Sequence, residues 1–401
     1  MPPFDSIICV GQTTWEGDFQ KAVVQLMCEL AVRHRVLYVD YQHTAKDLLL
    51  GTLGRQKDVP TRAVVRLDNP LTTKPGKDGS LVHVWQPPVM LPINFLPPTL
   101  HDPLLKLNAG RLVSGLRQVM AKLGFKRPLV INGMHPVLGL ALLGELDEAG
   151  TIYYCFDEIT IARWMSKHGG RYEPDYLRRV DAVVTTSETL RQTKARLQPN
   201  AFCVKNGVNF PLFNQARILA EQHPPTRPVV GYLGTADDRV NVDIVEHCAR
   251  TMPDVTFQFI GEIKEPAITQ RLGTLPNVVF TPPHQPANLP PLLAGLSATM
   301  IPFVCNAHTY TIYPLKINEY LAGGLPVVST PFSILDEFTG IVELADTPEA
   351  FAKALRHALA DQAPAQIQAR VEMARGNSWA HRAKEFEAVF AQLMHKASPT
   401  S

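Results

Sequence analysis

Short apolar runs and helical stretches alternate along this chain, and their order constrains the fold more than any other feature of the sequence. The apolar runs contain few polar residues, which is typical of strands in a parallel sheet that helices cover on both faces. A repeated strand–helix order of this kind predicts a doubly wound α/β domain. The strands expected from the first series are Ser6–Val10, Val36–Val39, Val82–Trp85, Leu129–Asn132, Ile152–Phe156 and Ala182–Thr185.

The series starts again after the proline-rich segment 223–228, and a chain of 401 residues is long enough for two domains. We expect an N-terminal Rossmann-like domain over residues 1–205 and a C-terminal one over 206–378. The helix in residues 379–401 should pack back toward the N-terminal domain. Because ligands bind such sheets at the carboxyl ends of the strands, two facing domains predict a ligand cleft between them. The strands expected from the second series are Val229–Leu233, Thr256–Ile260, Val278–Phe280, Ala298–Ile301 and Pro326–Ser329.

Composition excludes several classes of protein. The net charge is only +2, so the chain lacks the strongly basic surface that binds duplex nucleic acid. The six cysteines form no Cys-x-x-Cys pair, which argues against a zinc site or a disulfide framework. Neither a signal peptide nor a membrane-spanning run of about 18 apolar residues is evident. We therefore expect a cytoplasmic protein.

The segment 306–331, NAHTYTIYPLKINEYLAGGLPVVSTP, carries the most informative pattern. A polar loop enters a helix near Pro314, and a Gly-Gly pair ends that helix before the next strand. The free N–H groups at a helix N-terminus attract an anion, and Lys316 in the first turn adds a full positive charge. Glu319, about one turn later, suits the paired hydroxyls of a ribose. The same spacing also fits a surface Lys–Glu pair on an ordinary helix.

This segment resembles the donor-site signature of retaining GT-B glycosyltransferases, the "group 1" family. The matching letters are Pro-Leu-Lys-x-x-Glu-Tyr-Leu-Ala-Gly-Gly-x-Pro-Val-Val-Ser-Thr. Within that family, the chain looks most similar to bacterial enzymes of teichuronic-acid and exopolysaccharide biosynthesis. The resemblance covers about residues 205–395 well, whereas the N-terminal half matches mainly in its pattern of strands. Further matching blocks, in the same order, are residues 205–209 (KNGVN), 230–235 (VGYLGT), 275–280 and 289–293.

The resemblance implies roles for the matching positions. Glu319 would bind the donor ribose, while Lys316, Arg239 and the loop at Gly234 would hold the diphosphate. The loop that ends at His284 would lie near the base. Arg239 matches the family's phosphate-binding lysine only with a shift of one residue, so it is alternatively a solvent-exposed arginine beside two aspartates. The full set of donor-binding candidates is Gly11, Gly234, Thr235, Arg239, His284, Thr311, Lys316 and Glu319.

One departure from the family pattern affects the donor sugar. The family has another glutamate eight positions before Glu319, where this chain has Thr311. A carboxylate contact to the sugar is therefore missing or replaced, and the identity of the sugar stays open. Two positive side chains and helix N–H groups can stabilise a departing diphosphate electrostatically. Because the chain also has no Asp-x-Asp pair, we expect neither a metal nor any other cofactor.

Three features of the N-terminal half are further candidates. The loop Gly11–Gly17 joins a strand to a helix, either as a glycine turn near the cleft or as a plain tight turn. His135 and Asp157 follow two expected strands, where residues of the cleft belong. His135 is a candidate for contact with the transferred sugar or the acceptor, and is alternatively a histidine at a helix start. Asp157 is a candidate to orient an acceptor hydroxyl, or a base if the enzyme inverts; alternatively it caps a helix.

The stretch Leu104–Arg127 combines an apolar stripe with six basic residues and no acidic one. Such a helix fits the surface of an anionic bilayer that holds a lipid-linked acceptor. The alternative is a domain helix with a solvated basic face. The membrane interpretation predicts a peripheral protein at the inner face of the plasma membrane.

Together these features predict a metal-independent glycosyltransferase of the hexosyltransferase type. It would move a sugar from a nucleotide-sugar donor to a saccharide or lipid-linked acceptor in cell-surface polysaccharide biosynthesis. The candidate catalytic residues are His135, Asp157, Arg239 and Lys316. Two alternatives stay open: a nucleotide-sugar epimerase of the same fold, and a subunit that binds sugar nucleotide or polysaccharide without turnover.

Overall fold

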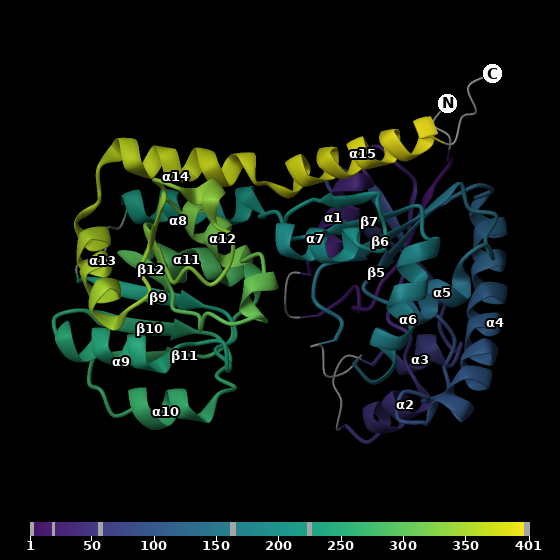
Figure 1. The fold of residues 1–401 in the computed structure, drawn as a ribbon, viewed down its shortest axis with the longest axis horizontal. Helices are drawn as coiled ribbons and strands as arrows, with labels where there is room; N and C mark the ends of the chain where they lie inside the picture. Colours follow the sequence, from purple (N-terminus) through teal and green to yellow (C-terminus); the bar gives the residue numbers. More distant parts are fainter. Residues whose placement is uncertain (1–3, 18–20, 55–58, 161–165, 223–226, 397–401) are drawn as a thin grey trace. The chain divides into compact units, whose positions relative to one another are not determined.

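The computed structural model describes residues 4–17, 21–54, 59–160, 166–222 and 227–396. The chain forms two compact units, which are described separately (Figure 1). The first unit runs to Lys205 and also includes the chain from Ala383 onward. The second unit comprises Asn206–Arg382.

The first unit is built on a sheet with the strand order β3-β4-β2-β1-β5-β6-β7-β8. All neighbouring strands are parallel except β3, which pairs antiparallel with β4. The expected apolar runs all form strands of this sheet. The strands are β1 (Ile7–Val10), β2 (Val36–Val39), β3 (Leu71–Pro75), β4 (Leu81–Trp85), β5 (Leu129–Gly133), β6 (Gly150–Cys155), β7 (Ala182–Thr185) and β8 (Ala201–Cys203).

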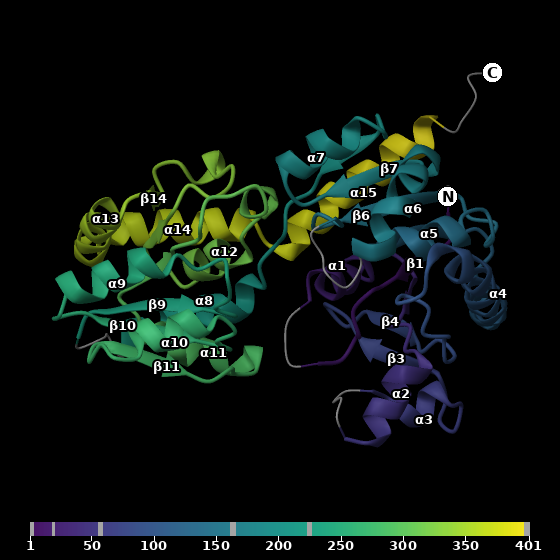
Figure 2. The same ribbon diagram turned by 60° about the horizontal axis from the view of Figure 1, so that its bottom comes forward.

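Helices cover both faces of this sheet (Figures 1 and 2). On one face, Leu112 and Leu116 of α4 and Tyr176 of α6 are fully buried in a core with strand residues such as Ile8. On the other face, Phe386 of α15 packs edge-on against Tyr154 of β6. The helices are α1 (Ala22–Leu30), α2 (Ala45–Thr52), α3 (Thr61–Val64), α4 (Pro98–Leu123), α5 (Pro136–Leu142), α6 (Ser166–Arg179), α7 (Glu188–Ala195) and α15 (Trp379–Lys396).

The second unit contains an all-parallel sheet with the strand order β11-β10-β9-β12-β13-β14. Central strand β9 begins the unit's series of strands, as expected from the restart after the proline-rich segment. The strands are β9 (Val229–Leu233), β10 (Thr256–Ile260), β11 (Val278–Thr281), β12 (Ala298–Ile301), β13 (Val327–Ser329) and β14 (Val342–Leu344).

Two groups of helices cover this second sheet: α8, α11, α12 and α14 pack on one another, and so do α9, α10 and α13 (Figure 1). Three short 3-10 helices lie in the connecting loops. The elements are α8 (Phe210–Gln222), α9 (Val242–Thr251), α10 (Pro266–Leu272), η1 (Pro286–Asn288), α11 (Leu289–Ala294), η2 (Thr309–Thr311), α12 (Leu315–Ala322), η3 (Asp336–Phe338), α13 (Pro348–Ala360) and α14 (Pro364–Gly376).

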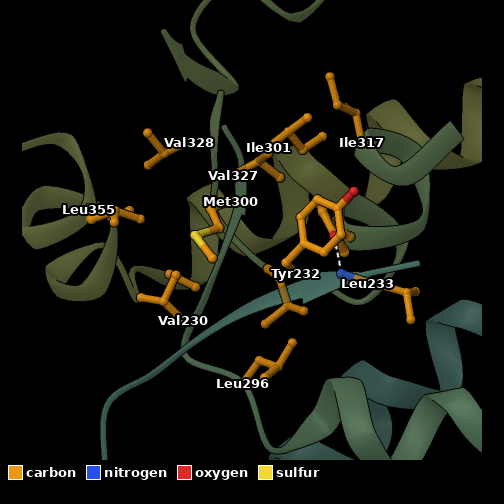
Figure 3. Close-up of a cluster of buried hydrophobic side chains, with 14 of the residues drawn as sticks. Val230, Tyr232, Leu233, Leu296, Met300, Ile301, Ile317, Val327, Val328 and Leu355 are labelled. Carbon is orange, nitrogen blue, oxygen red and sulfur yellow. Dashed lines mark hydrogen bonds between the residues drawn. The ribbon is translucent and has the colours of Figure 1, made fainter. Parts of the chain in front are cut away.

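The core of the second unit fixes helix α12 against the end of strand β9. Val230, Met300 and Ile317 are fully buried in one apolar cluster, part of which is drawn in Figure 3. The main-chain N–H of Leu233 donates a 2.7 Å hydrogen bond to the hydroxyl of Tyr320, and this bond is dashed in Figure 3. Because Tyr320 belongs to α12, this bond ties the helix to the carboxyl end of β9.

Helix α4 corrects one part of the sequence interpretation. The apolar stripe of the stretch Leu104–Arg127, including Leu105 and Val119, is buried in the first unit's core, so it is not available to enter a bilayer. Its basic residues stay exposed, and Arg117 pairs with Glu145 at 3.3 Å. Among the described helices, none has the length and apolar composition needed to cross a membrane.

Candidate functional site

The loop that follows β9 approaches the neighbouring strand too closely for a side chain. Gly234 has a φ of +108°, a conformation that L side chains rarely adopt. Its N–H donates to the carbonyl of Ile260 at 2.8 Å. Gly261 lies opposite, and a Cβ on Gly261 would come within 2.4 Å of the Gly234 carbonyl oxygen. The two glycines therefore allow the ends of β9 and β10 to lie in contact.

Main-chain hydrogen bonds hold the rest of this loop on both sides. Ala236 N–H donates to the Glu262 carbonyl at 2.8 Å, on the β10 side. On the β12 side, Val304 N–H donates to the Arg239 carbonyl at 2.7 Å. The loop ends where the side chain of Asn241 accepts a hydrogen bond from Ile244 N–H and caps helix α9. Residues 234–241 are thus fixed before any ligand arrives.

Lys316 reaches this loop from the first turn of α12. Its Nζ lies 5.1 Å from the ring centroid of Tyr232 and 5.4 Å from that of Phe303. Its Cε would lie 2.9 Å from a Cβ placed on Gly234, so the aliphatic stem rests against the glycine. Two aromatic faces and a missing side chain therefore position the ammonium group at the end of β9.

Arg239 brings a second positive charge to the same place. Its guanidinium carbon lies 5.3 Å from the Phe303 ring centroid, on the ring that Lys316 also contacts. Asp237 pairs with the guanidinium at 2.7 Å. Burial, and then the charge of Arg239, lower the pKa of Lys316. Two cations held this close, with one carboxylate between them, form a site that favours an anion.

Glu319 lies one turn after Lys316 on α12 and is half-buried. Burial raises the pKa of its carboxyl, while the charge of Lys316 opposes that rise. Among the described residues, no group donates a hydrogen bond to this carboxylate. A half-buried acceptor without a donor is costly to keep and is available to the hydroxyl groups of a ligand.

The other predicted donor residues of the second unit lie at the carboxyl edge of the same sheet. His284 follows β11 and is half-buried. Thr311 ends η2, and its hydroxyl donates to the carbonyl of His308 at 2.7 Å. The carbonyl of Thr235 accepts a hydrogen bond from the Tyr232 hydroxyl at 2.8 Å. The structure thus brings Gly234, Arg239 and Lys316 into one cluster, with His284 and Thr311 on loops of the same edge.

Sequence reasoning missed three members of the cluster: Tyr232, Asp237 and Phe303. Tyr232 lies within the quoted VGYLGT block, and Asp237 was noted only as a neighbour of Arg239. Phe303 follows strand β12, a position that places it at the same sheet edge. Topology could therefore have placed Phe303 near the site, although only the structure shows that its ring contacts both cations.

In the first unit, His135 starts helix α5, as the alternative interpretation of this residue has it. Its N–H donates to the side chain of Asn132 at 2.9 Å, and its Nδ1 accepts from Leu138 N–H at 3.3 Å. Burial lowers the pKa of His135 to about 4, so the ring is neutral at pH 7. Because Nδ1 accepts, the ring proton lies on Nε2. His135 can therefore offer one N–H donor to a ligand while it caps the helix.

A cavity of about 280 Å³ lies against His135, and we call it the His135 cavity. Apolar side chains from residues 90–95 and from α4 and α5 form much of its wall. Gln12, Gln42 and Asn108 supply polar groups. The lining also includes the charged residues Lys46 and Asp47, so the cavity combines apolar and polar walls. A cavity with convergent polar groups is a candidate small-molecule site.

Asp157 lies in the loop after β6, and its carboxylate accepts a hydrogen bond from Glu158 N–H at 2.8 Å. Glu158 in turn forms an ion pair with Lys194 at 3.1 Å, and Lys194 pairs with Glu173 at 2.9 Å. The carboxylate is thus bonded to the adjacent main chain. A buried ion-pair network holds the loop in place.

Gly11 is required by packing in the first unit. A Cβ at this position would come within 2.1 Å of the Tyr38 hydroxyl. The carbonyl of Gly11 accepts a hydrogen bond from the side chain of Gln42 at 3.0 Å. This glycine turn places Gln12 on the wall of the His135 cavity. In the described ranges, no group of three or more His, Cys, Asp or Glu side chains is arranged to hold a metal ion.

Comparison with known proteins adds independent evidence. Residues 227–361 match the model of the family described as "Glycosyl transferases group 1". A curated relative, TuaH of Bacillus subtilis (strain 168), is described as a glycosyltransferase of teichuronic acid biosynthesis. It is 27% identical over 168 residues, which are 38% of this chain and 41% of TuaH. The match thus spans about two fifths of that relative.

Solved structures resemble almost the whole chain. Sucrose-phosphate synthase from Thermosynechococcus elongatus has a TM-score of 0.69 at 16% identity, over 98% of this chain and 100% of that one. Trehalose 6-phosphate synthase from Burkholderia multivorans has a TM-score of 0.66 at 14% identity, over 99% and 98%. Anabaena HepE in complex with UDP has a TM-score of 0.60 at 16% identity, over 96% and 100%. At these identities, the likeness establishes a shared fold.

Proposed function

We propose that this chain transfers a sugar from a nucleotide-sugar donor to a saccharide acceptor. The match of residues 227–361 to the group 1 glycosyltransferase model and the GT-B fold of the solved structures above support this proposal. One observation carries the proposal. Lys316 and Arg239 lie over one aromatic ring at the carboxyl end of the matched sheet, and Glu319 lies one turn away without a hydrogen-bond donor among the described residues.

In the proposed reaction, the bond between the sugar's anomeric carbon and the diphosphate breaks. Its electron pair goes to the phosphate oxygen. Lys316 and Arg239 stabilise the negative charge that grows there, in a place shielded from water by Tyr232 and Phe303. Because these side chains supply the positive charge, the proposal needs no metal. Glu319 accepts hydrogen bonds from the ribose hydroxyls.

The acceptor hydroxyl attacks the anomeric carbon from the same face of the sugar from which the diphosphate departs. The proton of this hydroxyl passes to the leaving phosphate oxygen. The configuration of the sugar is therefore retained. His135, neutral and with its proton on Nε2, donates a hydrogen bond to the transferred sugar or the acceptor. We assign Asp157 no proton transfer in this scheme, because its carboxylate already holds the loop after β6.

The acceptor is proposed to be a saccharide, free or lipid-linked, in the synthesis of a cell-surface polysaccharide. The description of TuaH as a teichuronic acid biosynthesis glycosyltransferase supports this role. HepE was solved in complex with UDP, which makes UDP the first nucleotide to test. A cytoplasmic enzyme would reach a lipid-linked acceptor at the inner face of the plasma membrane through the exposed basic face of α4, without inserting apolar side chains.

Incubation with a panel of radiolabelled nucleotide sugars and a lipid extract tests the proposal. Label that moves into a saccharide or lipid product, and is lost in Lys316→Ala, supports the transferase. Conversion of the donor into an isomeric nucleotide sugar would instead reveal an epimerase of the same fold. Binding of the donor without any turnover would identify a non-catalytic subunit. Thr311, which stands where the family has a glutamate, is the feature that favours this outcome.

A further inference from the structure

A second cavity lies in the first unit, apart from the residues used in the proposed reaction. We call it the Asp40 cavity. Its volume is about 180 Å³, below the roughly 300 Å³ at which sites for drug-sized ligands begin. A ligand of this size is a single ring. The lining residues include Trp15, Asp40, Asn69, Thr72, Lys74 and Gln86.

Asp40 supplies the chemical character of this cavity. The residue is only 9% exposed. One carboxylate oxygen, Oδ1, accepts hydrogen bonds from the N–H groups of Trp15 and Tyr41, both at 2.8 Å. No group of the described residues donates a hydrogen bond to the other oxygen, Oδ2. Burial raises the pKa of Asp40 to about 6. A buried carboxylate with an unused oxygen favours a ligand that donates hydrogen bonds.

Gln86 adds a second acceptor beside Asp40. The residue is 5% exposed, and its side-chain nitrogen donates to the Tyr41 carbonyl at 3.0 Å. That bond fixes the orientation of the Gln86 amide. The side-chain oxygen is the other polar atom of this amide. Within the described ranges, this oxygen has no hydrogen-bond partner. Because this oxygen has almost no accessible surface, it is a buried acceptor beside Asp40 rather than a group exposed in the cavity.

Trp15 provides an apolar surface in the same cavity. It is half-buried, and its ring packs edge-on against Tyr38 with centroids 5.3 Å apart. The cations near the cavity are already engaged: Lys74 pairs with Glu16 at 2.7 Å, and Lys21 donates to the Thr14 hydroxyl at 2.6 Å. An aromatic face next to hydrogen-bond acceptors suits a sugar ring. The carboxylate of Asp40 disfavours an anionic sugar.

The Asp40 cavity shares a wall with the His135 cavity. Asp40 lines the first, while Tyr41 and Gln42, the next two residues, line the second. The loop after β1 is divided in the same way, with Gln12 facing the His135 cavity and residues 14–16 facing the Asp40 cavity. The two cavities are therefore lined by neighbouring residues of the same two chain segments.

We propose that the Asp40 cavity binds one neutral or amino-sugar ring through Asp40 and Trp15. Resting on the proposed function, this ring is the acceptor unit that neighbours the reacting sugar, so the acceptor is an oligosaccharide rather than a monosaccharide. The cavity discriminates against uronic acids, because a ligand carboxylate would face Asp40 in a buried place.

Fluorine NMR of the full chain labelled with 5-fluorotryptophan tests this site without any donor. The chain has four tryptophans, so the Trp15 signal is assigned by its loss in Trp15→Phe. Glucose, glucosamine and glucuronate serve as probes that differ in charge. We expect the first two to shift the Trp15 signal saturably, and glucuronate to leave it unchanged.

Asp40→Asn should weaken the binding of glucosamine about tenfold or more, because a charged acceptor is lost. Asp68→Asn is the matched control, since Asp68 is an exposed carboxylate that pairs with Arg62 outside the cavity. Unchanged signals of the buried Trp85 and Trp379 in each variant show that the fold is kept. No Trp15 shift with any probe, equal shifts with glucuronate, or parental affinity in Asp40→Asn would overturn the proposal. The NMR measurement uses no donor, so a negative nucleotide-sugar assay does not affect it. The proposed transferase function and the proposed sugar site can therefore be rejected independently of each other.

Discussion

Both units place polar side chains at the carboxyl edge of a parallel sheet, but the two edges keep these side chains in different states. In the C-terminal unit, Lys316 and Arg239 share one aromatic ring, and Glu319 has no donor among the described residues. In the N-terminal unit, His135 caps a helix and Asp157 bonds to the adjacent main chain. The first edge concentrates charge, whereas His135 and Asp157 at the second edge bond to neighbouring main-chain groups.

This difference shows where ligand chemistry can be inferred from local geometry. Like charges held together and a half-buried carboxylate reduce stability, so their presence points to a ligand that offsets the cost. In the N-terminal unit, ligand binding is indicated instead by cavities, at His135 and at Asp40. The candidate site of the C-terminal unit is therefore defined by charges, and the candidate sites of the N-terminal unit are defined by cavities.

The largest expected effect comes from Lys316→Ala. Removing one preorganised group that stabilises transition-state charge costs about 10²–10³ in turnover. We expect this loss at saturating donor, with a smaller change in donor affinity, because the charge that Lys316 faces grows as the bond breaks. Steady-state kinetics with Lys316→Arg as the charge-preserving control measures it. Normal turnover in Lys316→Ala would remove the main contrast between the two units.

A second, smaller effect is expected for Glu319→Ala, which should weaken UDP binding by about 1.5–3 kcal/mol, the range for hydrogen bonds to a charged group. Calorimetric titration measures the dissociation constant directly. His135→Ala is the matched variant from the N-terminal unit, and should leave UDP affinity within experimental error. Equal losses in the two variants would show that nucleotide binding is not confined to the C-terminal half.

The pH dependence of UDP binding sharpens the same comparison. Burial and Arg239 lower the pKa of Lys316 to about 8 in the free protein, and a bound diphosphate should raise it. The contribution of Lys316 to affinity is therefore full below pH 8, and falls as pH rises through the free-protein pKa, by up to about tenfold per pH unit. Lys316→Arg, which stays charged, should abolish this fall. An identical pH profile in parent and variant would contradict the assignment.

The smallest effect concerns the basic face of α4. Each exposed basic residue near an anionic bilayer contributes about 1 kcal/mol, screened by salt. Since the apolar stripe of α4 is buried, we expect binding to anionic vesicles at low salt only. Changing Arg117, Lys122 and Lys126 together to glutamine should reduce it. Vesicle co-sedimentation at two salt concentrations tests this, and salt-resistant binding would point to a different, apolar surface.

The sequence predicted the buried strands well because their apolar runs need no tertiary information to be recognised. It missed β3, β8 and β14, which are only partly buried, so no apolar run marks them. β3 also pairs antiparallel at the sheet edge, outside the repeated strand–helix order. The GT-B fold that the sequence predicted is confirmed by the structural comparisons.

The sequence predicted those site residues that lie close together in the chain, and missed those that only the fold brings together. Lys316 and Glu319 lie on one helix, so their spacing is visible in the sequence. Phe303 joins them from another strand, and only the sheet order brings it close. The sequence did not mark Asp40 as a candidate site residue, because nothing distinguishes it from any polar residue at the end of a strand. Its burial and its unused oxygen are visible only in the fold. The roles assigned to these side chains stay predictions.

The central claim, that the C-terminal unit carries donor binding, is tested most directly by hydrogen–deuterium exchange of the full chain with and without saturating UDP. The account predicts slower exchange in residues 231–242, 260–264 and 313–322, the segments that surround Lys316 and Gly234. In Glu319→Ala, this protection should require more UDP. Protection that appears only in the N-terminal unit, while these three segments exchange at their unliganded rates under saturating UDP, would contradict the claim.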